Sequence, residues 1–88
     1  MAAISGAWER RVRDLTEIVM SPDLPLRQDV LDFLRCGEAA LAVETLADWI
    51  GELEDTSVVS RAHRFELIDL SSGFSEETRD RVAKAVAE

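Results

Sequence analysis

Acidic residues recur at short intervals in the middle of this 88-residue chain, and they are the first candidates for a chemical role. With about 100° of rotation per residue, Glu44, Asp48, Glu52 and Asp55 fall within about 80° of one another on one side of a helix, and we call these four residues the acidic stripe. Glu54 lies beside them in the sequence. Carboxylates four residues apart repel each other by roughly 0.2–0.5 kcal/mol per pair, which favours a role in binding a basic partner. A solvated helix face that aids solubility is the alternative.

The charge of the chain is concentrated in the same segment. Residues 36–60 contain six acidic residues and no Lys, Arg or His, whereas the whole chain has a formal net charge of −8. Nucleic acids and anionic membranes are bound through Lys and Arg that meet phosphate, so the charge argues against both as direct ligands. It favours a basic protein as the partner, because complementary charge steers association.

Other chemistry-bearing residues are few. His63 is the only histidine and Cys36 the only cysteine, and neither has a second ligand at metal-binding spacing. The chain has no glycine-rich phosphate loop and no calcium loop. We therefore predict a protein that is not an enzyme and that uses no metal or cofactor, with Cys36 as a small buried hydrophobe and His63 on a helix surface or half-buried. The alternative for Asp48 and Glu52 is a cation-binding pair in a metal-binding or enzymatic subunit.

Hydrophobic residues at helical spacing predict an all-α fold, a single small domain of residues 1–88 in a compact bundle of about four to five helices. The expected helices cover residues 7–20, 25–36, 37–55, 61–70 and 76–87, with residues 1–6 frayed, a polar loop at 54–57 and no strand. The third helix should be central. Gly37 should take a left-handed conformation between the second and third helices, and Ser60 and Ser75 should cap the last two. Gly51, inside the third helix, permits close packing or softens the last turn.

The same spacing predicts which side chains face the core, with Leu46 and Trp49 largely buried. The predicted inner faces are Trp8, Val12, Leu15, Ile18 and Val19 in the first helix, Leu26, Val30, Phe33 and Leu34 in the second, Ala39, Ala42, Leu46, Trp49, Ile50 and Leu53 in the third, Ala62, Phe65, Leu67, Ile68 and Leu70 in the fourth, and Val82, Ala83 and Val86 in the fifth.

Residues 31–70 resemble the MafI family of bacterial immunity proteins. The resemblance lies in Gly37-Glu38 between two helices, the run Leu41-Ala42-Val43-Glu44-Thr45-Leu46, the following Asp48, Ile50 and Glu52, and the capped helix from Val59-Ser60 onward. It implies a small, acidic, all-helical antagonist that protects the producing cell by binding a cognate toxin domain, often a nuclease. This chain departs from the pattern because it has no Tyr, and its first, proline-bounded helical hairpin has no counterpart in the pattern.

Charge and resemblance together predict a cytoplasmic immunity protein that binds its toxin through Glu44, Asp48, Glu52, Glu54 and Asp55. A small helical adaptor or regulator of a basic protein is the alternative. No apolar run approaches the ~20 residues of a membrane span, and the first residues lack the pattern of a secretory leader. The sequence does not specify the oligomeric state.

Overall fold

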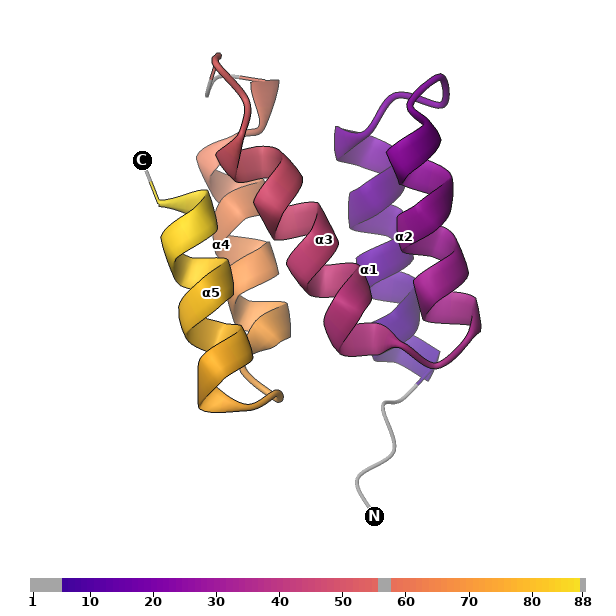
Figure 1. The fold of residues 1–88 in the computed structure, drawn as a ribbon, viewed down its shortest axis with the longest axis vertical. Helices are drawn as coiled ribbons and strands as arrows, with labels where there is room; N and C mark the ends of the chain where they lie inside the picture. Colours follow the sequence, from indigo (N-terminus) through magenta and orange to yellow (C-terminus); the bar gives the residue numbers. More distant parts are fainter. Residues whose placement is uncertain (1–5, 56–57, 88) are drawn as a thin grey trace.

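The residues that the structure describes form five helices, and the all-α prediction is confirmed. The computed structural model describes residues 6–55 and 58–87, and no strand is present in these two segments. The helices are α1 (Gly6–Val19), α2 (Pro25–Arg35), α3 (Ala39–Gly51), α4 (Arg61–Ser71) and α5 (Glu76–Val86) (Figure 1). Gly6 opens α1 rather than belonging to a frayed end, and residues 1–5 of that prediction lie outside the described residues.

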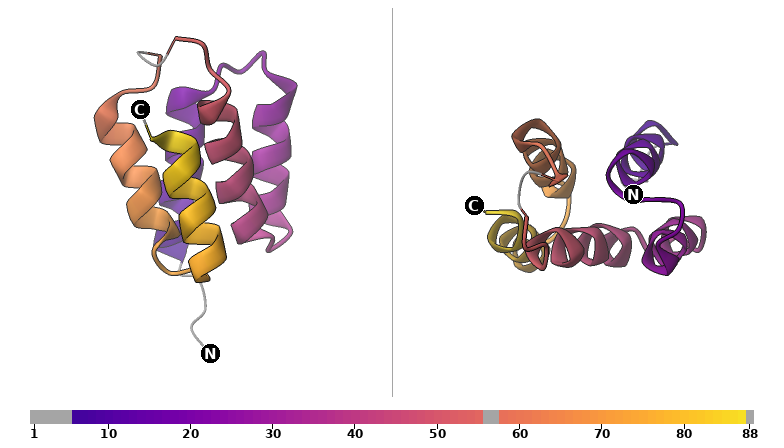
Figure 2. Two further views of the ribbon diagram at one scale, coloured as in Figure 1. Left: turned by 60° about the vertical axis from the view of Figure 1, so that its left-hand side comes forward. Right: turned by 90° about the horizontal axis from the view of Figure 1, so that it is seen from above.

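The helices form two layers around α3. Viewed from above, α2, α3 and α5 lie in one row, while α1 and α4 lie in a second row over α2 and α5 (Figure 2, right). α3 contacts each of the other four helices, α5 most extensively. The expectation that the third helix is central is therefore confirmed, and the side of α3 that faces α5 lies against another helix.

Local signals in the sequence determine most of the helix ends. Gly37, between α2 and α3, has a backbone φ of 78°. This lies in the left-handed region, which glycine adopts at little cost because it has no Cβ. Ser60 and Ser75 cap α4 and α5, their side-chain oxygens accepting from the backbone N–H of His63 and Thr78. The end of α3 was predicted wrongly. The helix stops at Gly51, with Glu52 as its C-cap, so the residues beyond it leave the helical register.

The core runs through all five helices. Leu46 is 0% exposed as predicted, whereas Trp49 is only partly buried. α3 buries a wider face than expected, because Val43 and Ala47 are inside along with the predicted Ala42, Leu46 and Ile50. The buried hydrophobic residues are Val12, Leu15, Met20, Val30, Leu34, Ala42, Val43, Leu46, Ala47, Ile50, Val59, Leu67, Leu70, Val82 and Val86.

The inner face of α4 was predicted wrongly. Phe65 is 61% exposed and Ala62 is also exposed, while the charged Arg64 is buried in their place. Arg64 donates from Nε to the carbonyl oxygen of Val59 (3.1 Å) and from Nη1 to that of Val86 (3.3 Å). These backbone acceptors satisfy a cation that would otherwise be costly to bury, and they join the start of α4 to the end of α5.

Three further side chains predicted to be inside are exposed. Ile18 in α1 is 65% exposed, and Ala83 in α5 and Cys36 after α2 are exposed as well. In α1 the buried position next to Leu15 is taken by Thr16, whose hydroxyl donates to the carbonyl oxygen of Val12 (2.8 Å). That hydrogen bond lets a polar side chain occupy the core, a possibility that hydrophobic periodicity does not reveal.

Candidate functional site

The acidic stripe does not form one surface, because α3 ends in the middle of it. Glu44 and Asp48 lie within α3 and face α5. Glu52 is the C-cap of α3, and Glu54 and Asp55 lie in the chain that follows. The predicted binding residues therefore separate into a group on α3, which contacts α5, and a group in the segment after α3. We call Glu52, Glu54 and Asp55 the acidic loop.

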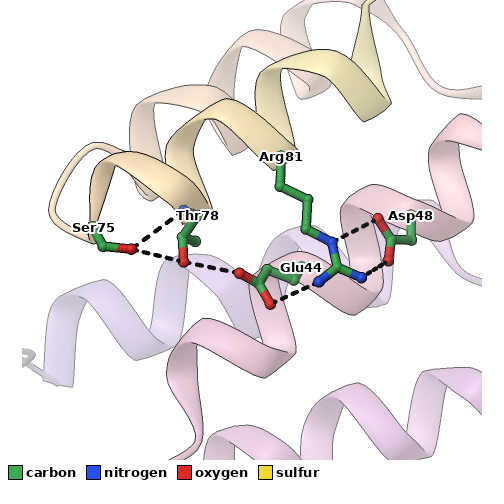
Figure 3. A network of polar contacts seen from close by, with 5 residues as sticks. All are labelled: Glu44, Asp48, Ser75, Thr78 and Arg81. Carbon is green, nitrogen blue, oxygen red and sulfur yellow. Dashed lines mark hydrogen bonds and ion pairs between the residues drawn. The ribbon is translucent and has the colours of Figure 1, made fainter.

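The first group is held by α5 (Figure 3). Arg81 donates from Nη2 to Oδ2 of Asp48 (2.6 Å), from Nε to Oδ1 of Asp48 (3.4 Å) and from Nη1 to Oε1 of Glu44 (3.4 Å). Thr78 donates from its hydroxyl to Oε2 of Glu44 (2.8 Å), and the Ser75 hydroxyl lies 3.3 Å from that of Thr78. One arginine thus bridges two carboxylates a helical turn apart, the bidentate geometry that guanidinium favours.

These contacts give the carboxylates of Glu44 and Asp48 a positively charged partner. The hydrogen bond that Arg81 donates to Asp48, then the negative charges of Asp48 and Glu44, raise the pKa of the Arg81 guanidinium above its ordinary value. A raised pKa means that the stabilisation is complete at every pH below that ordinary value and is lost only as a strongly alkaline solution deprotonates the folded form. The pair is therefore intact at neutral pH. Residues 36–60 contain no basic residue, but Arg81 of α5 compensates Glu44 and Asp48 from a distant part of the chain.

The position of Glu44 supports a structural role. Its side chain is only 16% exposed, and both of its oxygens have partners on α5. Gly51, two turns further along the same face of α3, packs against the backbone of Ala85 in α5. Because α3 and α5 approach this closely, the carboxylates of Glu44 and Asp48 meet Thr78 and Arg81 directly. Glu44 and Asp48, two of the predicted site residues, therefore join α3 to α5.

The acidic loop is placed differently. Glu52, Glu54 and Asp55 are all exposed, and they follow the carboxyl end of α3, whose last turn contains no basic residue. A helix carries partial negative charge at that end, so acidic residues there are disfavoured. Figure 1 shows the end of α3, which this loop follows, at the same end of the bundle as the start of α4.

Acidic residues elsewhere are easier to explain. Glu76 and Glu77 occupy the first turn of α5, where the partial positive charge of a helix start stabilises them. The acidic loop instead follows the carboxyl end of a helix, where the partial charge of the helix is negative. Val58, which follows it, exposes 57% of its surface. The loop therefore combines carboxylates with an exposed apolar side chain, a combination suited to binding a protein surface.

The remaining chemical candidates do not come together. Cys36 follows α2 and His63 lies in the first turn of α4, and these two helix ends are at opposite ends of the bundle (Figure 1). Among residues 6–55 and 58–87, no group of three or more His, Cys, Asp or Glu is arranged to hold a metal ion. In the same part of the chain, no helix is long and apolar enough to cross a membrane.

Sequence reasoning missed Arg81, Thr78 and Ser75. The base that compensates Asp48 is not a neighbour in the sequence, because Arg81 lies 33 residues beyond it. A signal was present, because Ala47 and Gly51 interleave with Glu44 and Asp48 at helical spacing. Small residues on one side of a helix allow another helix to approach closely, so that side was a candidate contact face.

Comparisons with protein-family models, with curated proteins and with solved structures found no match.

Proposed function

We propose that this protein is a non-catalytic immunity protein of the MafI type, which binds a basic cognate toxin domain in the cytoplasm through its acidic loop. The observation that carries the proposal is the placement of Glu52, Glu54 and Asp55 at the carboxyl end of α3, where they gain nothing from the helix dipole. The resemblance of residues 31–70 to that family supplies the kind of partner.

The electrostatics support a basic partner over other ligands. The helices α1, α2, α4 and α5 each contain equal numbers of acidic and basic residues. The net charge of the chain therefore resides in α3 and in the connecting and terminal segments, and Arg81 engages both acidic residues of α3. The acidic loop is the largest group of acids outside the helices. A nuclease-type toxin presents a basic surface for its substrate, and complementary charge accelerates capture and disfavours wrong partners.

The neighbouring structure supports the loop as a binding element. Close packing of Gly51 against Ala85 fixes the end of α3, so the loop starts from a rigid position, which lowers the entropic cost of binding. Val58 supplies an apolar contact beside the carboxylates. Glu44 and Asp48 contribute indirectly, by holding α3 against α5.

A charge-reversal experiment tests the proposal. The product of the adjacent gene is purified in inactive form, and its association with wild type is compared with that of the Glu52→Lys/Glu54→Lys variant. Reversal should slow association by about tenfold or more, since steering changes on-rates by 10–10³. The matched control is Asp29→Lys/Asp80→Lys, which makes the same change in net charge at two exposed helical positions. It should bind nearly as wild type does.

The assay distinguishes the outcomes. Raising the salt concentration should weaken wild-type binding and reduce the difference between the variants, because exposed charges are screened over about 8 Å at physiological ionic strength. Equal binding and equal protection in co-expression by the Glu52/Glu54 variant would refute the site. A basic partner other than a toxin, recovered from the native host, would support the adaptor alternative instead.

A further inference from the structure

The layer formed by α1 and α4 presents exposed apolar side chains that the proposed function does not use. Ile18 is 65% exposed and Phe65 is 61% exposed, the two largest values among the exposed large hydrophobic residues. Both were expected in the core from their spacing, and both face outward. Large apolar groups on the outside of a small protein indicate an interaction surface when they gather in one place.

The contacts between α1 and α4 place these side chains on one face. Arg11 in α1 contacts Glu66 (3.8 Å) and Asp69 (3.3 Å) in α4 across the seam between the helices. Ile18 follows Arg11 by seven residues, two turns of helix, so the two share a side of α1. Phe65 precedes Asp69 by four residues, one turn, and shares its side of α4.

The relative direction of the helices brings the apolar groups together. The Trp8 indole near the start of α1 donates to the carbonyl oxygen of Leu70 near the end of α4 (3.0 Å), so the helices are antiparallel. The last turns of α1, with Ile18, therefore lie beside the first turns of α4, with Ala62 and Phe65. We call the outer side of this layer the α1–α4 face, consisting of Arg11, Ile18, Ala62, Phe65, Glu66 and Asp69.

We propose that the α1–α4 face binds the same face of a second copy of this chain. Its charges are mixed, Arg11 against Glu66 and Asp69, and α1 and α4 each carry equal numbers of acidic and basic residues. A partner with charge of one sign gains little there. A copy related by a two-fold axis brings its own Arg11 against Glu66 and Asp69, since in such an interface each patch meets itself.

The arrangement of α1 and α4 also favours a second copy of the chain as the partner. Two antiparallel helices side by side are half of a four-helix bundle, and α1 and α4 form such a pair on one side of the molecule (Figure 2, right). A second copy completes the bundle by packing its own pair against the first. Ile18 and Phe65 then take the positions of core residues between the two layers.

The size of the α1–α4 face determines how tightly two copies of the chain should associate. With 14 residues in α1 and 11 in α4, the helices are about 21 and 16 Å long, and side by side they span roughly 20 Å. The flat footprint is therefore about 400 Å², roughly half of the ~800 Å² per partner found in standard interfaces. The dimer is accordingly weak and reversible, and it dissociates on dilution.

Sedimentation equilibrium of the full chain tests the proposal. The mass of wild type should rise from 9.8 kDa toward twice that value as concentration increases from about 10 µM to about 1 mM, the range of a weak complex. Ile18→Ser and Phe65→Ser should each weaken the dimer at least tenfold while keeping the helical circular dichroism spectrum, because both side chains are exposed. Leu41→Ser is the control, since it removes a 43% exposed leucine from α3 in the other layer.

A charge swap tests whether the two copies meet through this face. The variant Arg11→Glu/Glu66→Arg/Asp69→Arg restores complementary pairs within its own dimer but opposes like charges in a mixed dimer with wild type. It should associate with itself and not exchange subunits with wild type. The proposal is overturned if wild type remains at 9.8 kDa throughout, if Leu41→Ser dissociates the dimer as much as Phe65→Ser does, or if swapped and wild-type chains mix freely.

Discussion

Replacing Gly51 by alanine sets two physical effects against each other. Alanine has a higher helix propensity than glycine by about 1 kcal/mol at an interior position, so propensity alone predicts stabilisation. Gly51 is the last residue of α3, where that benefit is smaller. A Cβ added there would lie 2.7 Å from the carbonyl oxygen of Ala85, 3.3 Å from its carbonyl carbon and 3.4 Å from its Cα.

The clash should win because its partner is backbone. Carbon–oxygen contacts normally begin near 3.3 Å, so α5 would have to withdraw by about 0.6 Å. No rotamer change relieves this, and moving α5 disturbs the buried Val82 and Val86 and the pairing of Arg81. Overpacking of this kind costs about 1–3 kcal/mol, so a net destabilisation of about 1–2 kcal/mol remains after the propensity gain. The melting temperature should fall by roughly 4–16 °C in a chain of this size.

Thermal unfolding followed by circular dichroism measures the effect, with Gly73→Ala as the control. Gly73 has no heavy atom within 4 Å of its added Cβ and no positive φ, so alanine there should be neutral or stabilise by about 0.4–1 kcal/mol through the unfolded state. The two glycine-to-alanine changes should thus differ in sign. A Gly51→Ala variant as stable as wild type would show that α3 and α5 are not in close contact at this point.

The other stability predictions concern the core and the helix caps. Leu46→Ala should lower the free energy of unfolding by about 2–5 kcal/mol in denaturant titrations, because Leu46 is fully buried, and a loss below ~1 kcal/mol would contradict the central place of α3. Ser60→Ala and Ser75→Ala should each cost about 0.5–2 kcal/mol, with the larger loss at Ser75, whose hydroxyl also contacts Thr78; no loss at either position would contradict the capping geometry.

The fold could be predicted from the sequence because its signals are local. Pro25 at the start of α2, the left-handed Gly37 and the serine caps of α4 and α5 act on the backbone within a few residues. The end of α3 could not be located in this way. The hydrophobic and acidic periodicity continues past Gly51 to Leu53 and Asp55, although the helix has already ended. Periodicity shows which residues would share a face, but it does not show where the hydrogen bonding stops.

The candidate site was predicted only in part, because its decisive contacts join distant segments. Glu44 and Asp48 were read as a solvent-facing stripe, and Arg81 of α5 turns them into a link between helices. Phe65 was predicted to lie in the core, whereas its side chain is exposed. Arg64 beside it finds backbone acceptors at Val59 and Val86, so the charged residue faces inward and the aromatic one faces out. Neither result follows from residue type alone.

The two proposed surfaces should respond to salt in opposite directions, which separates them in a single preparation. Partner binding at the acidic loop depends on attraction between unlike charges, so added salt weakens it. Association through the α1–α4 face brings together two chains that each carry −8, while the face itself carries the mixed charges of Arg11, Glu66 and Asp69 beside the apolar Ile18 and Phe65. Salt screens the overall repulsion and leaves the apolar contact intact, so the dimer should strengthen between about 50 mM and 500 mM salt. Self-association that weakens over this range would show that the pairs of Arg11 with Glu66 and Asp69 between the copies, and not the apolar contact of Ile18 and Phe65, dominate the association.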